Sequence, residues 1–488
     1  MNRLSSVLLR LFQSVWSFYI LKKNHLLSVT GALLLLAGGY ILFHARDSAT
    51  TAPVHADSTP AFQLPEGGRI VDGRIVHECR DGDTAQKLMR LYYSHSRIFV
   101  RDDLKEALVR ENSALSSRHG CKKGDLISIP EPIIEPLKNR PLQMTGPIRA
   151  IYLRGENAVP GRLSAELRRM KRVNANSVVF DVKDISGVVN YKSSVAEVEK
   201  YRRHPAPIPD LPKMIDYLHS NGIYVIARTA MFQDENLSTV RPDLAISDRN
   251  SPTGRLLFKG RPLWVDPGHP EVQLYNLKII HELVQLGVDE IQLDYIRYPA
   301  EGDLSGVSYF RVKNPLDKTQ HLKEFLAAAW ILTRTTDVKL AVDVFGVVAW
   351  GEEADRNRTG QRLEAFAPYV DVVSPMLYPS HFNRGFDGFG QPADEPVYFY
   401  KVGNQKVREM MGANVVIRPW LQAFKWRVSN YGESYILRQI QGSEAGGGEG
   451  WMMWNAGNEY DVVYRALAGE RTVELVDHID PQSQEKVN

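Results

Sequence analysis

Two aspartates stand at the ends of two runs of β-favouring residues. Asp294 closes the run EIQLD at 290–294, and Asp343 closes the run KLAVD at 339–343. If these runs are adjacent parallel strands, about 4.8 Å apart, their ends can bring two carboxyl groups within ~5–10 Å of each other. At that spacing a proton donor and a nucleophile or base act on a glycosidic bond. Asp294 and Asp343 are therefore the first candidates for a catalytic pair.

Asp294 also has a structural interpretation. A buried ionised carboxylate costs several kcal/mol unless it is paired or hydrogen-bonded. Arg297 and Tyr298, in the loop that follows, could be its partners. Asp294 could then cap the next element or pair with Arg297 without any catalytic role. Polar endings on the other runs of the same kind favour the catalytic interpretation.

The run that contains Asp294 is one of eight that alternate with amphipathic helical patterns. The eight runs lie at 148–153, 177–181, 223–228, 290–294, 339–343, 370–375, 415–419 and 450–454. Eight strand-then-helix units in roughly 320 residues predict an α/β fold, a (β/α)8 TIM-type barrel, in preference to an open doubly wound sheet. No glycine-rich phosphate loop follows the first run, which argues against a nucleotide site.

Polar or aromatic side chains follow these runs at the end where TIM barrels place their sites. Aromatic faces and fixed polar groups on one rim are typical of a sugar site. The candidate substrate-binding residues are Tyr152, Asp181, Lys183, Asp184, Arg228, Trp264, Asp266, Arg297, Tyr378, Trp420, Gln422, Trp454 and Asn455. Asp181 or Asp184 is also a reserve candidate for catalysis, and Asp266 is another. Asp266 precedes Pro267, and an aspartate before proline is equally typical of a turn or helix start.

Four segments carry a resemblance to a known family. WVDPGHPEV, DEIQLDYIRYP, VDVFG and DVVSPMLYPSHF resemble a family of glycoside hydrolases with (β/α)8 barrels, formerly a domain of unknown function and similar in its strand ends to the α-amylase superfamily. The resemblance covers residues 147–465 and implies a hydrolase of a polysaccharide, with Asp294 as the family's acidic residue after strand four. The α-amylase superfamily places a glutamate proton donor where this chain has Asp343. The donor could therefore be Glu352, Glu353 or Asp371, with Asp343 binding sugar.

A separate small module is predicted at 74–132. A strand-like run, two helical patterns and the closing run LISIP follow one another there, with GDT near the start and KGDLISIP at the end. The module resembles the lysin motif (LysM), a family that binds glycans containing N-acetylglucosamine, such as peptidoglycan or chitin. A structural spacer is the alternative.

The only two cysteines of the chain, Cys79 and Cys121, fall inside this module. Outside the cytoplasm they should be able to form a disulfide. Metal binding is not expected, because two cysteines without a nearby pair of histidines do not make a tetrahedral site.

The strongest topological signal is the segment at 26–43, which has 18 residues and no charge. As a helix it would rise ~1.5 Å per residue and nearly span a ~30 Å hydrocarbon core. Four basic residues precede it, which predicts that residues 1–25 are cytoplasmic or interfacial. We therefore expect an uncleaved, single-pass anchor in the inner or cytoplasmic membrane, with the later domains facing the periplasm or cell exterior.

The predicted order after the anchor is a flexible tether at 44–73, the small module, a linker at 133–147, the barrel at 148–470 and a polar tail at 471–488. The chain of 488 residues is 43% hydrophobic and 24% charged, as is ordinary for globular proteins. Five basic residues and no acid among residues 1–46 account for the net charge of +3, so nucleic acid is not an expected partner.

These patterns predict a membrane-anchored glycosidase without a cofactor, acting on an extracytoplasmic or cell-envelope polysaccharide. The first alternative is a non-catalytic carbohydrate-binding or scaffolding protein of the cell wall. A second alternative is a metal-dependent deacetylase or phosphodiesterase, against which the shortage of histidines at strand ends argues.

Overall fold

The computed structural model describes residues 63–117 and 119–477. The predicted anchor at 26–43 lies outside these residues, as does most of the predicted polar tail. Within the described ranges no helix has both the length and the apolar character to cross a bilayer.

The small module has an antiparallel sheet in the order β1-β2-β3 and two helices. Its elements are β1 (Gly68–Val71), β2 (Arg74–Glu78), α3 (Ala85–Tyr92), α4 (Arg101–Glu111) and β3 (Leu126–Ser128). Thr84 caps α3 by accepting a hydrogen bond from the Lys87 N–H. Ile75, Leu88, Leu104 and Ile127 meet in its core. The strand, helix, helix, strand order agrees with the prediction, and β1 is an additional strand.

Cys79 and Cys121 are joined by a disulfide, and the two cysteines are 42 residues apart in the sequence. Cross-linking a loop of this size restricts the unfolded chain and typically stabilises a small domain by ~2–4 kcal/mol.

We expect the variant Cys79→Ser/Cys121→Ser to lose that much free energy of unfolding, measured by urea denaturation of the full chain. Reductant should produce the same loss in the wild type and none in the variant. Equal stability of the two proteins would contradict the prediction.

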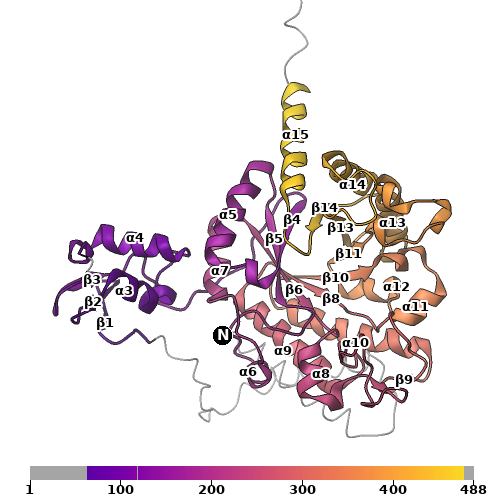
Figure 1. Cartoon of the computed structure of the whole chain (residues 1–488), viewed down its shortest axis with the longest axis horizontal. Coiled ribbons are helices and arrows are strands. Elements are labelled where there is room, and N and C mark those ends of the chain that lie inside the picture. The colour runs from indigo at the N-terminus through magenta and orange to yellow at the C-terminus, as the bar shows by residue number, and fades with distance from the viewer. Residues whose placement is uncertain (1–62, 118, 478–488) are drawn as a thin grey trace, which may run out of the picture. The chain divides into compact units, whose positions relative to one another are not determined.

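The large domain is an α/β fold built on a curled, parallel, nine-stranded sheet (Figure 1). Its strand order is β12-β11-β10-β8-β6-β5-β4-β14-β13. The strands are β4 (Ile148–Leu153), β5 (Ser177–Lys183), β6 (Tyr224–Ala230), β8 (Glu290–Asp294), β10 (Lys339–Phe345), β11 (Val372–Met376), β12 (Val416–Ile417), β13 (Trp420–Gln422) and β14 (Gly450–Trp454).

The two edge strands, β12 and β13, are separated in the chain only by Arg418 and Pro419. β12 pairs with β11 at one edge, whereas β13 pairs with β14 at the other. Proline has no N–H to give to a strand ladder, which accounts for the interruption. The run predicted as one strand at 415–419 is therefore only partly a strand, and a second short strand follows it.

Helices lie around the curled sheet (Figure 1). They are α5 (Pro160–Met170), α6 (Ala196–Tyr201), α7 (Leu211–Ser220), α8 (Glu235–Val240), α9 (Pro270–Leu286), α10 (Pro315–Thr333), α11 (Glu353–Thr359), α12 (Leu363–Phe366), α13 (Pro396–Met411), α14 (Glu433–Ala445) and α15 (Asp461–Asp477). β7 (Ser247–Asp248) and β9 (Val307–Ser308) form a separate antiparallel pair. α9 ends at Gly287, whose φ of 75° lies in the left-handed region that glycine adopts without strain, and the chain then turns into β8.

Candidate active site

Asp294 is the last residue of β8 and lines a cleft of ≈ 670 Å³. The backbone N–H of Tyr295 donates to Asp294 Oδ1 at 2.6 Å, and the Asp294 carbonyl accepts from the Met231 N–H at 2.8 Å. Tyr295 has a φ of 52°, in the left-handed region that few non-glycine residues occupy. Such strain is typical of functional sites, and here it belongs to the residue that fixes one oxygen of Asp294.

Arg228, on β6, binds the other oxygen of Asp294. Its Nε donates to Asp294 Oδ2 at 3.0 Å, and its Nη2 donates to the same atom. Its Nη1 donates to Asp181 on β5, whose other oxygen accepts from the Tyr152 hydroxyl at 2.6 Å. A buried row of Tyr152, Asp181, Arg228 and Asp294 thus crosses four neighbouring strands.

The sequence suggested Arg297 and Tyr298 as partners of Asp294, and this suggestion is wrong. Arg297 instead donates to Glu301 Oε1 at 2.9 Å, and its guanidinium lies 5.0 Å from the Trp264 ring. The backbone turn at Tyr295 directs the following loop away from the Asp294 carboxylate, so that Arg228 from the adjacent strand takes its place.

Asp343, on β10, lies behind the cleft. Its side chain is fully buried; Oδ1 accepts from Trp420 Nε1 at 2.8 Å, and Oδ2 has no hydrogen-bond partner among the described residues. Oδ2 is 4.0 Å from Arg228 Nε, the atom that is 3.0 Å from Asp294 Oδ2. The two carboxyl oxygens cannot be further apart than the sum of these distances, which is below the upper limit of the separations that glycosidase carboxyl pairs use (~9.5 Å).

The charges around Arg228 do not balance when all the aspartates that contact it are ionised. Asp181, Asp294 and Asp343 share one cation, Arg228. Burial, followed by the negative charge of Asp294, raises the pKa of Asp343 well above its usual range. Burial also raises the pKa of Asp181, although Arg228 and Tyr152 oppose it. Burial and the neighbouring charge of Asp294 thus both favour the protonated form of Asp343 over its carboxylate.

The raised pKa of Asp343 makes stability depend on pH. The contribution of its proton is fully present below the unfolded pKa of ~3.9 and is lost as the pH rises through the higher pKa of the folded state. Because Asp343→Asn is neutral at every pH, we expect the variant to gain stability relative to the wild type above pH ~4, by at most about 1.4 kcal/mol per pH unit. Urea unfolding between pH 4 and 8 measures this, and parallel curves for the two proteins would contradict it.

The cleft is lined by several of the residues that the sequence singled out and by others that it did not. The first group is Arg228, Asp294, Arg297, Tyr378, Trp420 and Trp454. The second group includes Phe345, Phe382 and Phe386, together with two carboxyl groups, Glu301 and Asp355. Glu301 lies in the loop after β8 and Asp355 on α11, so neither stood at the end of a predicted strand.

Two predicted residues on the second strand do not line the cleft. The Lys183 ammonium is fully buried, 2.7 Å from Asp234 Oδ2 and 2.9 Å from Asn276 Oδ1. Asp184 Oδ1 accepts from the backbone N–H groups of two residues in its own turn, and burial raises its pKa to about 6. Lys183 thus ties the end of β5 to Asp234 and Asn276, and Asp184 stabilises its own turn.

Four other predicted residues support the loops around the cleft. Asp266 accepts from the Gly268 and Phe310 N–H groups, as its position before proline suggested, and burial raises its pKa to about 6. Trp264 is 4% exposed beneath Arg297. Gln422 Nε2 donates to the Phe424 carbonyl, and Asn455 Nδ2 donates to the Ala423 carbonyl. Both amides therefore fix the same segment after β13.

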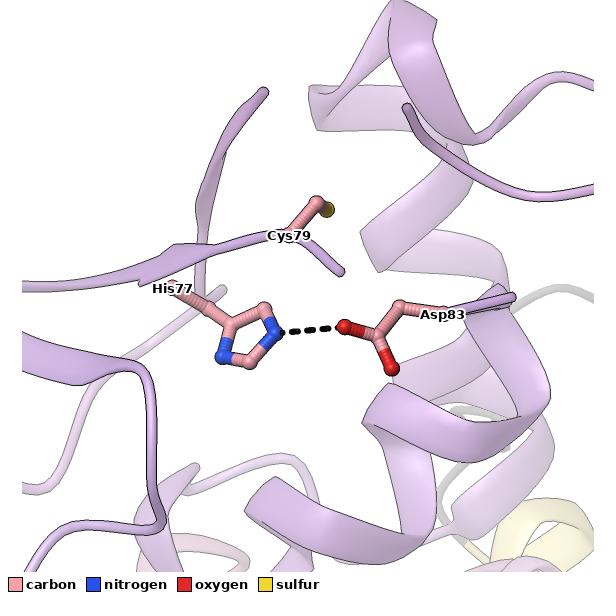
Figure 2. A group of neighbouring side chains, drawn as sticks. All are labelled: His77, Cys79 and Asp83. Carbon is pink, nitrogen blue, oxygen red and sulfur yellow. Dashed lines mark hydrogen bonds and ion pairs between the residues drawn. The ribbon is translucent and has the colours of Figure 1, made fainter. Parts of the chain in front are cut away.

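One group of three potential metal ligands lies close together in the described part of the chain, and it is in the small module (Figure 2). His77, Cys79 and Asp83 have ligand atoms within 4.8 Å of one another. However, the Cys79 sulfur is bonded to Cys121, His77 Nε2 lies 3.1 Å from Asp83 Oδ2, and Asp83 also binds the Lys87 ammonium. The oxidised module offers no thiolate to a metal there.

Comparison with known proteins gives a family. Residues 150–460 match the model of a family described as "Putative glycosyl hydrolase domain". No curated protein sequence matches the chain.

Several solved structures are similar to parts of the chain. A hypothetical protein from Ruminiclostridium thermocellum is 29% identical, covering 39% of this chain and 96% of its own, with a TM-score of 0.35. The glycoside hydrolase domain of PgaB (BpsB) from Bordetella bronchiseptica is 15% identical, covering 66% and 98%, with a TM-score of 0.49. The spore cortex-lytic enzyme SleL from Bacillus megaterium is 11% identical, covering 80% and 85%, with a TM-score of 0.40.

Proposed function

The chain belongs to the glycosyl hydrolase family whose model matches residues 150–460, and on that premise we propose that it cleaves glycosidic bonds in an extracytoplasmic or cell-envelope polysaccharide. One observation carries the choice of site: Asp294 lines the aromatic cleft while Arg228 and the Tyr295 N–H hold both of its oxygens. A carboxylate fixed in this way acts as the nucleophile or base of glycoside hydrolysis.

Asp343 acts through Asp294 in this proposal. Its side chain is fully buried and does not line the cleft, so Asp343 positions Asp294 through Arg228, which both residues contact, and does not touch the sugar. Arg228 donates two charge-assisted hydrogen bonds to Asp294 Oδ2 and so fixes the position of the carboxylate. Trp454, the most exposed of the three predicted aromatic residues that line the cleft, offers a ring against which a pyranose packs, with Tyr378 and Trp420 buried beside it.

The proton donor that we propose is Asp355. It lines the cleft and forms no ion pair among the described residues. Glu301 also lines the cleft, but Arg297 holds its pKa below the usual range although burial opposes this, which makes Glu301 a poor acid at neutral pH. Of the donors considered from sequence, Asp371 pairs with Arg334 just before β11 begins, at the end of the strand remote from the cleft, and Glu353 pairs with Arg362.

The remaining parts of the proposal concern architecture and location. β12 and β13 together take the place of one barrel strand and close the sheet into a (β/α)8 barrel. The small module binds an N-acetylglucosamine-containing glycan in the manner of LysM, and the segment at 26–43 anchors the chain in the membrane with its domains outside. The apolar, uncharged composition of that segment supports the anchor.

A non-catalytic carbohydrate-binding protein is the second candidate, favoured by the 4% exposure of Asp294. The two are separated by incubating the full chain with peptidoglycan, chitin and extracted envelope polysaccharides, and by measuring new reducing ends and bound glycan together. Release of reducing ends supports the glycosidase. Glycan binding without release supports the second candidate.

A further inference from the structure

A second cavity of ≈ 590 Å³ adjoins the cleft. The two cavities share Phe382 and Asn383 in their walls, so they are neighbours, and we refer to them together as the groove. The polar groups that line only the second cavity come from Arg384, Arg427 and Gln391. No acidic side chain of the described residues lines it, whereas the first cavity contains three carboxyl groups. The second cavity is therefore the cationic end of the groove.

Its two arginines are available for a ligand. Both are exposed, and neither forms a salt bridge with any described residue. Arg427 is held in place: its guanidinium lies 4.3 Å from the Trp426 ring centroid, its Nη1 donates to the Ser380 carbonyl at 3.3 Å, and its own carbonyl accepts from Gln391 Nε2 at 2.8 Å. Its φ of 60° shows that the chain adopts an uncommon backbone conformation at this point.

A row of aromatic rings connects the cleft with this cationic end. Trp454 lies 5.4 Å from Phe424, Phe424 lies 6.0 Å from His381, and His381 lies 5.1 Å from Trp426, measured between ring centroids. Trp426 is 50% exposed, His381 is also exposed, and Phe424 and Trp454 are partly buried. Exposed aromatic faces beside a cleft suit the C–H faces of successive sugars.

Building on the proposed function, we propose that the groove binds several consecutive sugars and that Arg384 and Arg427 bind the carboxylate of an acidic sugar unit beyond the cleaved bond. Guanidinium groups bind a planar carboxylate through two parallel hydrogen bonds, which makes arginine the suitable residue for this recognition. Trp426 packs against the same or the adjacent ring. The substrate is then an acidic glycan, with its charge read at a distance from Asp294.

Binding to the full chain carrying Asp294→Asn tests this without turnover. Three probes of equal length are compared by calorimetry: chitin oligosaccharides, which are neutral; peptide-free peptidoglycan strands, which carry lactyl carboxylates; and hyaluronan oligosaccharides, which carry uronates. Adding Arg384→Gln and Arg427→Gln is expected to weaken binding of at least one acidic probe roughly tenfold, and chitin binding by less than about twofold. Whichever acidic probe is affected identifies the source of the carboxylate.

Lys425→Gln is the matched control, because it removes an exposed positive charge from the same segment without lining the groove. The small module is identical in all variants, so its contribution cancels. Equal losses for neutral and acidic probes, an equal loss in the control, or no loss at all would each overturn the subsite. Reducing ends released by the wild type are measured in parallel, so that a charge-dependent subsite without hydrolysis refutes only the glycosidase.

Discussion

Asp294→Asn is expected to lower glycan hydrolysis by about 10³-fold while the protein remains folded. The amide is nearly the same size as the carboxylate, and its oxygen can still accept from Arg228 Nε, which now bonds Asp294 at 3.0 Å. It carries no negative charge, however, and can neither attack a sugar nor activate water. The measurement is kcat from reducing-end release, with circular dichroism and thermal unfolding to verify the fold.

Asp303→Asn is the control for this substitution. Asp303 is exposed in the loop after β8, where its carboxylate accepts from the Ser305 N–H and does not line the cleft. The control should retain the kcat of the wild type. If Asp294→Asn kept more than a tenth of the activity, hydrolysis would have to be carried out elsewhere, and the cleft would lose its proposed role.

The strands of the large domain could be predicted because their signal is local. Short apolar runs bounded by turns gave β4, β8 and β14 with the same first and last residues that the structure has. The seventh run, at 415–419, was an exception, since only its residues 416–417 form a strand, β12, and the chain after Pro419 forms β13 at the opposite edge of the sheet order. Only pairing partners distant in sequence reveal that division.

The direction of side chains on β5 could not be read from the sequence. Asp181 and Lys183 are two residues apart, and in a regular strand they would face the same side. The register with β6 shifts between them, as in a β-bulge, so Asp181 reaches Arg228 while Lys183 turns to Asp234. One extra residue in a ladder therefore decides which of the two belongs to the site.

The partner of the Asp294 side chain could not be predicted from the sequence either. Arg228 is 66 residues earlier in the chain, and only the adjacency of β6 and β8 brings the two together. The sequence offered near neighbours instead. Glu301 and Asp355 lie on a loop and a helix where acids are common on any soluble protein, and no periodic pattern distinguishes them from solvated residues.

The roles of the cleft carboxyl groups can be separated by the leaving group of the substrate. A proton donor assists departure of a sugar oxygen, which is a poor leaving group, and contributes roughly 10²–10⁴-fold to the rate. In an aryl glycoside whose phenol has a low pKa, the phenolate leaves without that assistance. We therefore expect Asp355→Asn to lower kcat for the polysaccharide by ~10²–10⁴-fold and for such an aryl glycoside by less than about tenfold.

Glu301→Gln provides the comparison, because Glu301 lines the same cleft but pairs with Arg297. Its effect should be small and the same for both substrates. If Asp355→Asn lowered both activities equally, Asp355 would only bind sugar, and the proton would have to come from Glu301 or from a carboxyl group that enters the cleft with the substrate.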